Sequence, residues 1–123
     1  YLRDQGLVER SAEEGAYFQS RAESLMDSPI VGHVRGRGFL VGVEYVADKE
    51  KGTVFPRELR VCETIRDIGF ENGLVTCSIS SFADGVDGDG LAIKPPLTTP
   101  REDVDRIFDI MTETLEQAER RFL

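Results

Sequence analysis

The stretch VRGRGFLVGVE, residues Val34–Glu44, decides the fold because it indicates two short strands joined by a glycine turn. Apolar and β-branched residues dominate Ile30–Val34 and Phe39–Val46, which is the composition expected of strands. Gly36 and Gly38 stand between these runs, and glycine permits a tight turn or a close approach of two backbones. We therefore predict a hairpin-like pair of strands over these two runs.

Helical patterns flank the strand pair. Apolar residues recur at helical spacing over Leu7–Asp27, and Pro29 then disfavours helical backbone in the residue before it. A second helix is predicted over Pro56–Asn72, because proline suits the first turn and Gly73 suits the C-terminal cap. One helix therefore precedes the strand pair and another follows it.

The last helix has the clearest signal. Thr99 can cap it, Pro100 fits its first position, and Glu102 completes a capping box. A continuous apolar stripe then predicts one buried face. The stripe consists of Val104, Ile107, Phe108, Met111, Leu115, Ala118 and Phe122.

Two short strands are predicted between the second and third helices, over Leu74–Ile79 and Leu91–Ile93. They enclose Ser80–Gly90, which holds three Gly and three Asp and is predicted to be a mobile, polar loop outside the core. The resulting order of elements is α-β-β-α-β-β-α. The predicted fold class is α+β, with a small antiparallel or mixed sheet of about four strands and helices packed on one face.

Composition limits the classes of function. The chain has 123 residues, 40% of them hydrophobic and 31% charged, which is enough for one domain with a single core. A net charge of -8 argues against a nucleic-acid partner, because phosphate binding needs a basic face. The longest apolar run, Phe39–Val43, is far too short for a membrane span.

The cysteines and the histidine indicate neither a disulfide framework nor a metal centre. Cys62 and Cys77 are too few for a disulfide scaffold, so a reduced, cytoplasmic protein is expected. With His33 they are too widely spaced to predict a zinc site.

Motifs that would carry chemistry are incomplete. The glycines around Arg37 would begin a dinucleotide-binding GxGxxG motif, but Val41 replaces its last glycine and a strand follows instead of a helix. An EF-hand loop counted from Asp87 would need Glu at position 98, where Thr98 stands. No catalytic, cofactor-binding or metal-binding residue is therefore predicted in this chain.

Three segments, in order, resemble the class III pyridoxal-phosphate-dependent aminotransferases. Gly6–Arg10 with Gly15–Tyr17 resembles the family's GLxERAxxxGxyL helix, and Val34–Glu44 resembles its VRGxGLMxGxEL strand pair. Gly88–Thr98, with the sequence GDGLAIKPPLT, resembles the family's GDxxxxxPPLxIT segment. Together the three segments span essentially the whole chain. The resemblance implies that residues 1–123 are the C-terminal small domain of a fold-type I enzyme.

In this family the full-length protein is usually a homodimer that moves an amino group between an amine or amino acid and a keto acid. The resemblance implies that a lysine and an aspartate of the large domain hold pyridoxal phosphate, and that this domain is absent from the chain. The lysines here are Lys49, Lys51 and Lys94, and none matches the family's Schiff-base position. The isolated chain is therefore expected to be inactive.

The small domain of such enzymes closes one side of the substrate pocket and often supplies an arginine for the substrate carboxylate, which the guanidinium fork matches. Ala92 and Asp87 stand where relatives carry those arginines. The remaining substrate-side candidates are Arg37, Asp87 and Lys94, each of which could instead be a solvated surface charge. An alternative interpretation of the whole chain is a free-standing regulatory or ligand-binding α+β module without catalysis.

Overall fold

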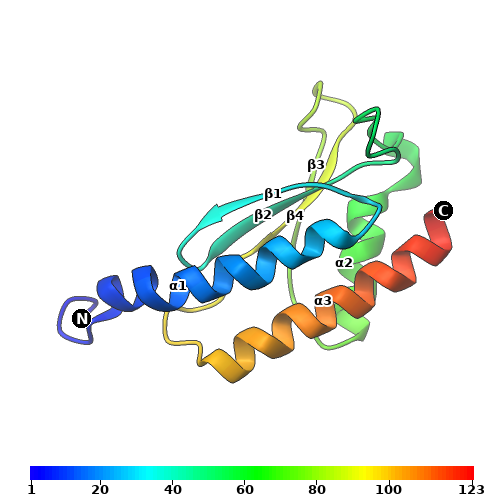
Figure 1. Cartoon of the computed structure of the whole chain (residues 1–123). Helices are drawn as coiled ribbons and strands as arrows, with labels where there is room; N and C mark the ends of the chain where they lie inside the picture. Colours follow the sequence, from blue (N-terminus) through cyan, green and yellow to red (C-terminus); the bar gives the residue numbers. More distant parts are fainter.

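A computed structural model describes residues 1–123, and its elements follow the predicted order (Figure 1). They are α1 (Leu7–Glu23), β1 (Val31–Arg37), β2 (Leu40–Tyr45), α2 (Val61–Glu71), β3 (Cys77–Ser80), β4 (Asp89–Ile93) and α3 (Arg101–Phe122). The strands form one four-stranded antiparallel sheet in the order β1-β2-β4-β3. The predicted α+β class is confirmed.

One face of the sheet is buried and the other is open. In β2, Val41, Val43 and Tyr45 are buried, whereas Gly42 and Glu44 between them are only partly covered. The three buried residues pair with residues of β4 that are also buried, so the two central strands bury the same face. The helices lie on that side of the sheet (Figure 1).

Aromatic rings form the centre of the core. The ring centroid of Phe18 in α1 lies 5.4 Å from that of Phe39 and 5.0 Å from that of Phe108 in α3, the second pair meeting edge to face. The predicted apolar stripe of α3 faces this core and is confirmed. Its buried members are Val104, Phe108, Met111, Leu115 and Ala118, and Ile107 and Phe122 are half-buried.

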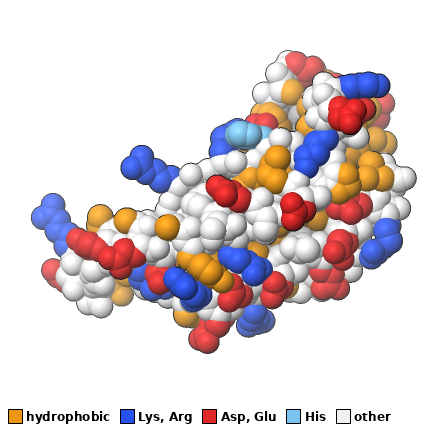
Figure 2. Space-filling view, viewed as in Figure 1, with side chains coloured by type: hydrophobic (Ala, Val, Ile, Leu, Met, Phe, Trp, Pro, Cys, Tyr) orange, Lys and Arg blue, Asp and Glu red, His pale blue; other side chains and the backbone are white.

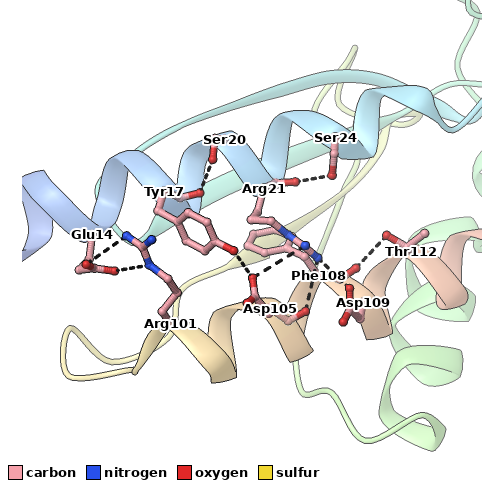
Figure 3. A network of polar contacts seen from close by, with 10 residues as sticks. All are labelled: Glu14, Tyr17, Ser20, Arg21, Ser24, Arg101, Asp105, Phe108, Asp109 and Thr112. Carbon is pink, nitrogen blue, oxygen red and sulfur yellow. Dashed lines mark hydrogen bonds and ion pairs between the residues drawn. The ribbon is translucent and has the colours of Figure 1, made fainter.

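Polar side chains align α1 and α3 along their shared edge (Figure 3). Arg101 Nε and Nη2 each lie 3.2 Å from the Glu14 carboxylate, and the guanidinium stands 4.1 Å from the centre of the Tyr17 ring. The Tyr17 hydroxyl donates to Asp105, which also lies 3.8 Å from Arg21. Exposed pairs of this kind contribute little free energy each, so their main effect is to set how the two helices align.

The glycine turn between β1 and β2 packs directly on α1. A side chain at Gly15 would place its Cβ 2.7 Å from the Cα of Gly38, and Gly38 itself has a φ of +59°. Gln19 Nε2 donates to the carbonyl oxygens of Gly38 and Leu40 at 2.9 and 3.0 Å. The predicted close approach of backbone at these glycines is confirmed, and it fixes the end of the strand pair against the helix.

The first two helices are shorter than predicted. α1 ends at Glu23 and continues as a 3-10 turn, Ser24–Asp27, so the predicted span Leu7–Asp27 holds only in part. The predicted start of the second helix at Pro56 is wrong, because Pro56 is extended and a separate 3-10 turn follows it. Arg60 then takes a left-handed backbone with a φ of 52°, and α2 begins only after this reversal.

Of the two strands that enclose the predicted loop, β3 begins later than expected and β4 begins earlier. β3 is Cys77–Ser80 and not Leu74–Ile79, whereas β4 begins at Asp89 instead of Leu91. Placing residues 89 and 90 in a polar loop outside the core was therefore wrong. Asp89 is fully buried, and Gly90 pairs with residues of both β2 and β3.

The predicted capping box of the last helix is also wrong. α3 begins at Arg101 with Pro100 as its N-cap and no side-chain cap. The Thr99 hydroxyl donates instead to the Pro96 carbonyl at 2.6 Å, and the Pro100 carbonyl accepts the N–H of Asp103 at 3.0 Å. Because the chain arrives through a turn after Pro96, the backbone satisfies the Thr99 side chain locally.

Charges of both signs are interspersed over the surface seen in Figure 2, and neither sign forms a large patch there. No helix is both long and apolar enough to cross a membrane.

Candidate functional site

Two of the three sequence-predicted site residues lie at the same end of the sheet. Arg37 pairs with Leu40 across β1 and β2, and Val41 pairs with Ile93 across β2 and β4. Lys94 follows Ile93, so the two cations stand on either side of β2. With neighbouring strands about 4.8 Å apart, their Cα atoms are separated by roughly 10 Å. Both are exposed and neither forms an ion pair within the chain.

Asp87 lies at the opposite end of β4. It precedes Asp89, which pairs with Tyr45 at the far end of β2. Asp87 is half-buried, and its Oδ1 accepts a hydrogen bond from the backbone N–H of Arg57 at 2.8 Å. The structure therefore brings Arg37 and Lys94 together and holds Asp87 away from them.

The predicted loop is confirmed over Ser81–Gly88, where the chain forms a compact, hydrogen-bonded turn. Three backbone hydrogen bonds close it, from Ser81 N to Gly88 O at 2.7 Å, from Ala83 N to Asp87 O at 3.0 Å and from Gly85 N to Ser81 O at 3.1 Å. Gly88 has a φ of +115°, and a Cβ there would lie 2.7 Å from the nitrogen of Ala83. Glycine at position 88 is thus required by the turn.

The acidic side chains of this turn accept hydrogen bonds from backbone amides. Asp84 Oδ1 accepts the N–H groups of Asp87 and Val86 at 2.7 and 2.9 Å, and these bonds lower the pKa of its carboxyl. Two apolar side chains of the turn are also exposed, Phe82 at 40% and Val86 at 62%, beside the exposed Asp84. The turn therefore presents hydrocarbon beside the negative charge that its sequence suggested.

A buried polar cluster lies under the turn. Asp89 is 0% exposed, and its Oδ1 accepts the N–H of Cys62, in the first turn of α2, at 2.9 Å. Arg57 Nη1 lies 3.7 Å from the same oxygen and 2.9 Å from Glu63 Oε2. The Cys62 thiol donates to Glu63 Oε2 at 3.2 Å. One cation thus faces two carboxylates at the start of α2, where the helix dipole also favours negative charge.

The electrostatics of the cluster follow from these contacts. The hydrogen bonds from Arg57 lower the pKa of Glu63 to about 2. Burial, together with hydrogen bonds to Asp89 and Glu63, raises the pKa of the Cys62 thiol to about 12. Burial also raises the pKa of the Tyr45 hydroxyl, which has no hydrogen-bonding partner in the chain. Near neutral pH the cluster therefore holds a neutral thiol, a neutral phenol and ionised Glu63.

The cluster has the donor spacing of a metal site but already contains a cation. One ligand atom each of Cys62, Glu63 and Asp89 lies within 4.8 Å of the other two. The guanidinium of Arg57 contacts both carboxylates, and a thiol with a raised pKa is a poor ligand because metals bind the thiolate. We interpret the cluster as carboxylates neutralised by arginine.

Sequence reasoning missed this cluster. The available signal was Asp89 in the Gly88–Gly90 segment. It is an acidic residue beside an apolar strand, and it belongs to the family-like segment GDGLAIKPPLT. The glycines and acidic residues of this segment suggested a solvated turn. No residue near Asp89 in the sequence shows that α2 packs over it. The partners, Arg57 and Glu63, lie far away in the sequence and show no motif.

Several known proteins are similar in sequence to this chain. No family model matches the chain. An uncharacterized aminotransferase of Schizosaccharomyces pombe is 36% identical over 115 residues, which cover 93% of this chain and 25% of that protein. The diaminobutyrate–2-oxoglutarate transaminase of Halomonas elongata is 36% identical over 107 residues, covering 86% of this chain and 22% of that protein.

These relatives are aminotransferases. A solved transaminase from work on directed evolution by ancestral reconstruction superimposes with a TM-score of 0.86 at 34% identity, covering 98% of this chain and 25% of that one. The fold matches the small C-terminal domain of transaminase structures. The chain spans about a quarter of the length of the curated relatives it matches.

The residues of this chain do not fit pyridoxal phosphate. Lys49 Nζ is held by the carbonyl oxygens of Met26 and Ser28, and Lys51 lies in the same exposed turn, 3.9 Å from Asp48. Lys94 stands exposed at the end of a strand. No lysine here lies in an enclosed site with an acid for the pyridine nitrogen, so we derive no catalytic step from this chain.

Proposed function

We propose that this chain is the C-terminal small domain of a class III pyridoxal-phosphate-dependent aminotransferase. It would close one side of the substrate pocket, while residues outside the chain hold the cofactor. The observation that carries the proposal is the coverage: aminotransferase similarity extends over 93% of this chain but only 25% of the relative. The remaining three-quarters of the relative has room for a cofactor-binding domain.

The open face of the sheet supports this role. A shallow hollow of about 90 Å³ on that face is lined by Ile79 and Phe82, by Gly42 and Gly90, and by the ion pair of Arg35 and Glu44. Ile79 is 42% and Phe82 40% exposed, and the Phe82 ring lies close to the buried Gly90. A pocket wall combines exposed apolar side chains with a few polar groups in this way.

The same surface suggests the substrates. The amino donor would be an amine or amino acid, the acceptor a keto acid, and the working unit a cytoplasmic homodimer. At the turn, Asp87 and the apolar Val86 offer nothing to a second carboxylate, so we infer a preference for neutral or cationic amines on that side. At the other end, Arg37 and Lys94 could attract a carboxylate, since neither has a partner within the chain.

Deleting residues 1–123 from the longer polypeptide tests the proposal. The longer polypeptide should transfer an amino group from an amine to a keto acid, and the deletion variant should retain a trappable cofactor but lose transfer. A longer polypeptide without transamination over a panel of amines and keto acids would contradict the proposal.

A further inference from the structure

Asp89 is a buried carboxylate that neither the core nor the proposed chemistry requires. It is the first residue of β4 and is fully buried, yet its Oδ2 has no hydrogen-bonding partner in the chain. Burying a carboxylate costs free energy unless charge and hydrogen bonds compensate. Here the compensation comes from the N–H of Cys62 and from the Arg57 guanidinium, 3.7 Å away.

These contacts connect Asp89 to the turn that follows β3. The side chain of Arg57 binds Glu63 and faces Asp89. These contacts hold the Arg57 backbone in position. The backbone N–H of Arg57 then donates to Asp87 Oδ1, inside the turn. The order of contacts is therefore Asp89, the guanidinium of Arg57, the backbone of Arg57, and Asp87.

Besides this hydrogen bond, the turn is held at its two ends by the pairing of Ser80 in β3 with Asp89 in β4. Its own hydrogen bonds close it internally, and its exposed side chains include Phe82, Val86 and Asp84. The ring of Phe82 does reach the sheet, since a Cβ at Gly90 would lie 3.2 Å from its Cε1. A flexible contact of that kind is non-directional, whereas the hydrogen bond between Arg57 and Asp87 fixes a direction.

We propose that Asp89 is a positioning residue that sets the conformation of the Ser81–Gly88 turn through Arg57. Its consequence for donor choice rests on the proposed aminotransferase function, while its consequence for the turn does not. Loss of the carboxylate would leave Arg57 paired with Glu63 alone and would remove the acceptor of Cys62 N–H. The 3-10 turn at Arg57 could then shift, and the hydrogen bond to Asp87 would no longer hold Phe82 and Val86 in place.

Hydrogen exchange on this chain tests the structural part. In Asp89→Ala, the amides of Ser81, Ala83 and Asp87 should exchange at least tenfold faster, whereas those of α3 change little more than the overall stability loss requires. Asp89→Asn keeps an acceptor for Cys62 N–H but removes the charge that faces Arg57, so it should accelerate the same amides by less than Asp89→Ala does. Val104→Ala, a buried change at the far helix, serves as the control for general destabilisation.

A second variant protects the test if Asp89→Ala does not fold. Asp87→Ala removes only the last contact, at a half-buried position, and should release the same turn amides. Turn amides that exchange at the parent rate in both Asp87→Ala and a folded Asp89→Ala would overturn the proposal. So would equal acceleration in Val104→Ala.

Kinetics of the longer aminotransferase test the link to donor choice. The ratio of kcat/KM for a neutral amine to that for an acidic amino donor should change at least fivefold in Asp89→Ala and by a smaller factor, in the same direction, in Asp89→Asn. A released turn with an unchanged ratio would refute the role in donor choice and leave the positioning of the turn intact. No transamination at all would instead refute the proposed function.

Discussion

Phe108→Ala tests the assignment of the core most sharply. Phe108 is 0% exposed and its ring meets Phe18 edge to face at 5.0 Å, so truncation removes both burial and an aromatic contact. Large-to-small changes of buried phenylalanine cost about 3–5 kcal/mol. A domain of 123 residues has a free energy of unfolding of about 6–18 kcal/mol at 0.05–0.15 kcal/mol per residue. The variant should therefore fold but lose a large part of its stability.

Urea unfolding followed by circular dichroism measures the effect. With an m-value of about 2 kcal/mol/M, the midpoint should fall by roughly 1.5–2.5 M in Phe108→Ala. Phe70→Ala is the matched control, because Phe70 is also on a helix but is 67% exposed, and its midpoint should move by less than about 0.3 M. Equal shifts in the two variants, or an unchanged midpoint in Phe108→Ala, would refute the core assignment.

Other predictions concern the turn, the polar cluster and the glycine contact. Gly15→Ala should lower the unfolding free energy by about 1–3 kcal/mol because its Cβ would meet Gly38. Gly42→Ala should change it little, because its Cβ would meet only the Arg35 carbonyl oxygen, at 3.8 Å; equal thermal midpoints would argue against the contact. The pKa of Glu63 is lowered to about 2, so its ionisation stabilises the fold above the ordinary pKa near 4.5 and this contribution disappears as pH falls toward 2. Glu63→Gln should thus be less stable than the parent at pH 7 with a gap that narrows between pH 5 and 2, and a pH-independent gap in urea midpoints would contradict the ion pair. In the longer aminotransferase, Asp87→Arg should raise kcat/KM for an acidic donor relative to a neutral amine, and a ratio unchanged within twofold would show that position 87 does not read the substrate.

The elements of this fold could be predicted because their signals are local. The stripe from Val104 to Phe122 and the strand pair around Gly36 and Gly38 express their periodicity and turn chemistry within a few residues. The element ends were less predictable, because distant contacts decide them. α2 begins after the left-handed Arg60, and the Asp89 carboxylate accepts an N–H of its first turn. No sequence signal near position 60 predicts a hydrogen bond to Asp89.

The residues of the candidate site could also be predicted only in part. The motifs identified Arg37 and Lys94 singly, and only the register of β1, β2 and β4 shows that they share one end of the sheet. Asp87 was identified by its place in the family motif. Its hydrogen bond to the backbone of Arg57 depends on packing between segments 30 residues apart, which no local pattern encodes.

The location of the cofactor tests the central claim most directly. The longer polypeptide should be loaded with pyridoxal phosphate, reduced with borohydride and digested, and the modified lysine identified by mass spectrometry, with the isolated 123-residue chain treated in parallel. We predict a single modified lysine outside residues 1–123 and no specific adduct on the isolated chain. A stoichiometric adduct on Lys49, Lys51 or Lys94 would contradict the account.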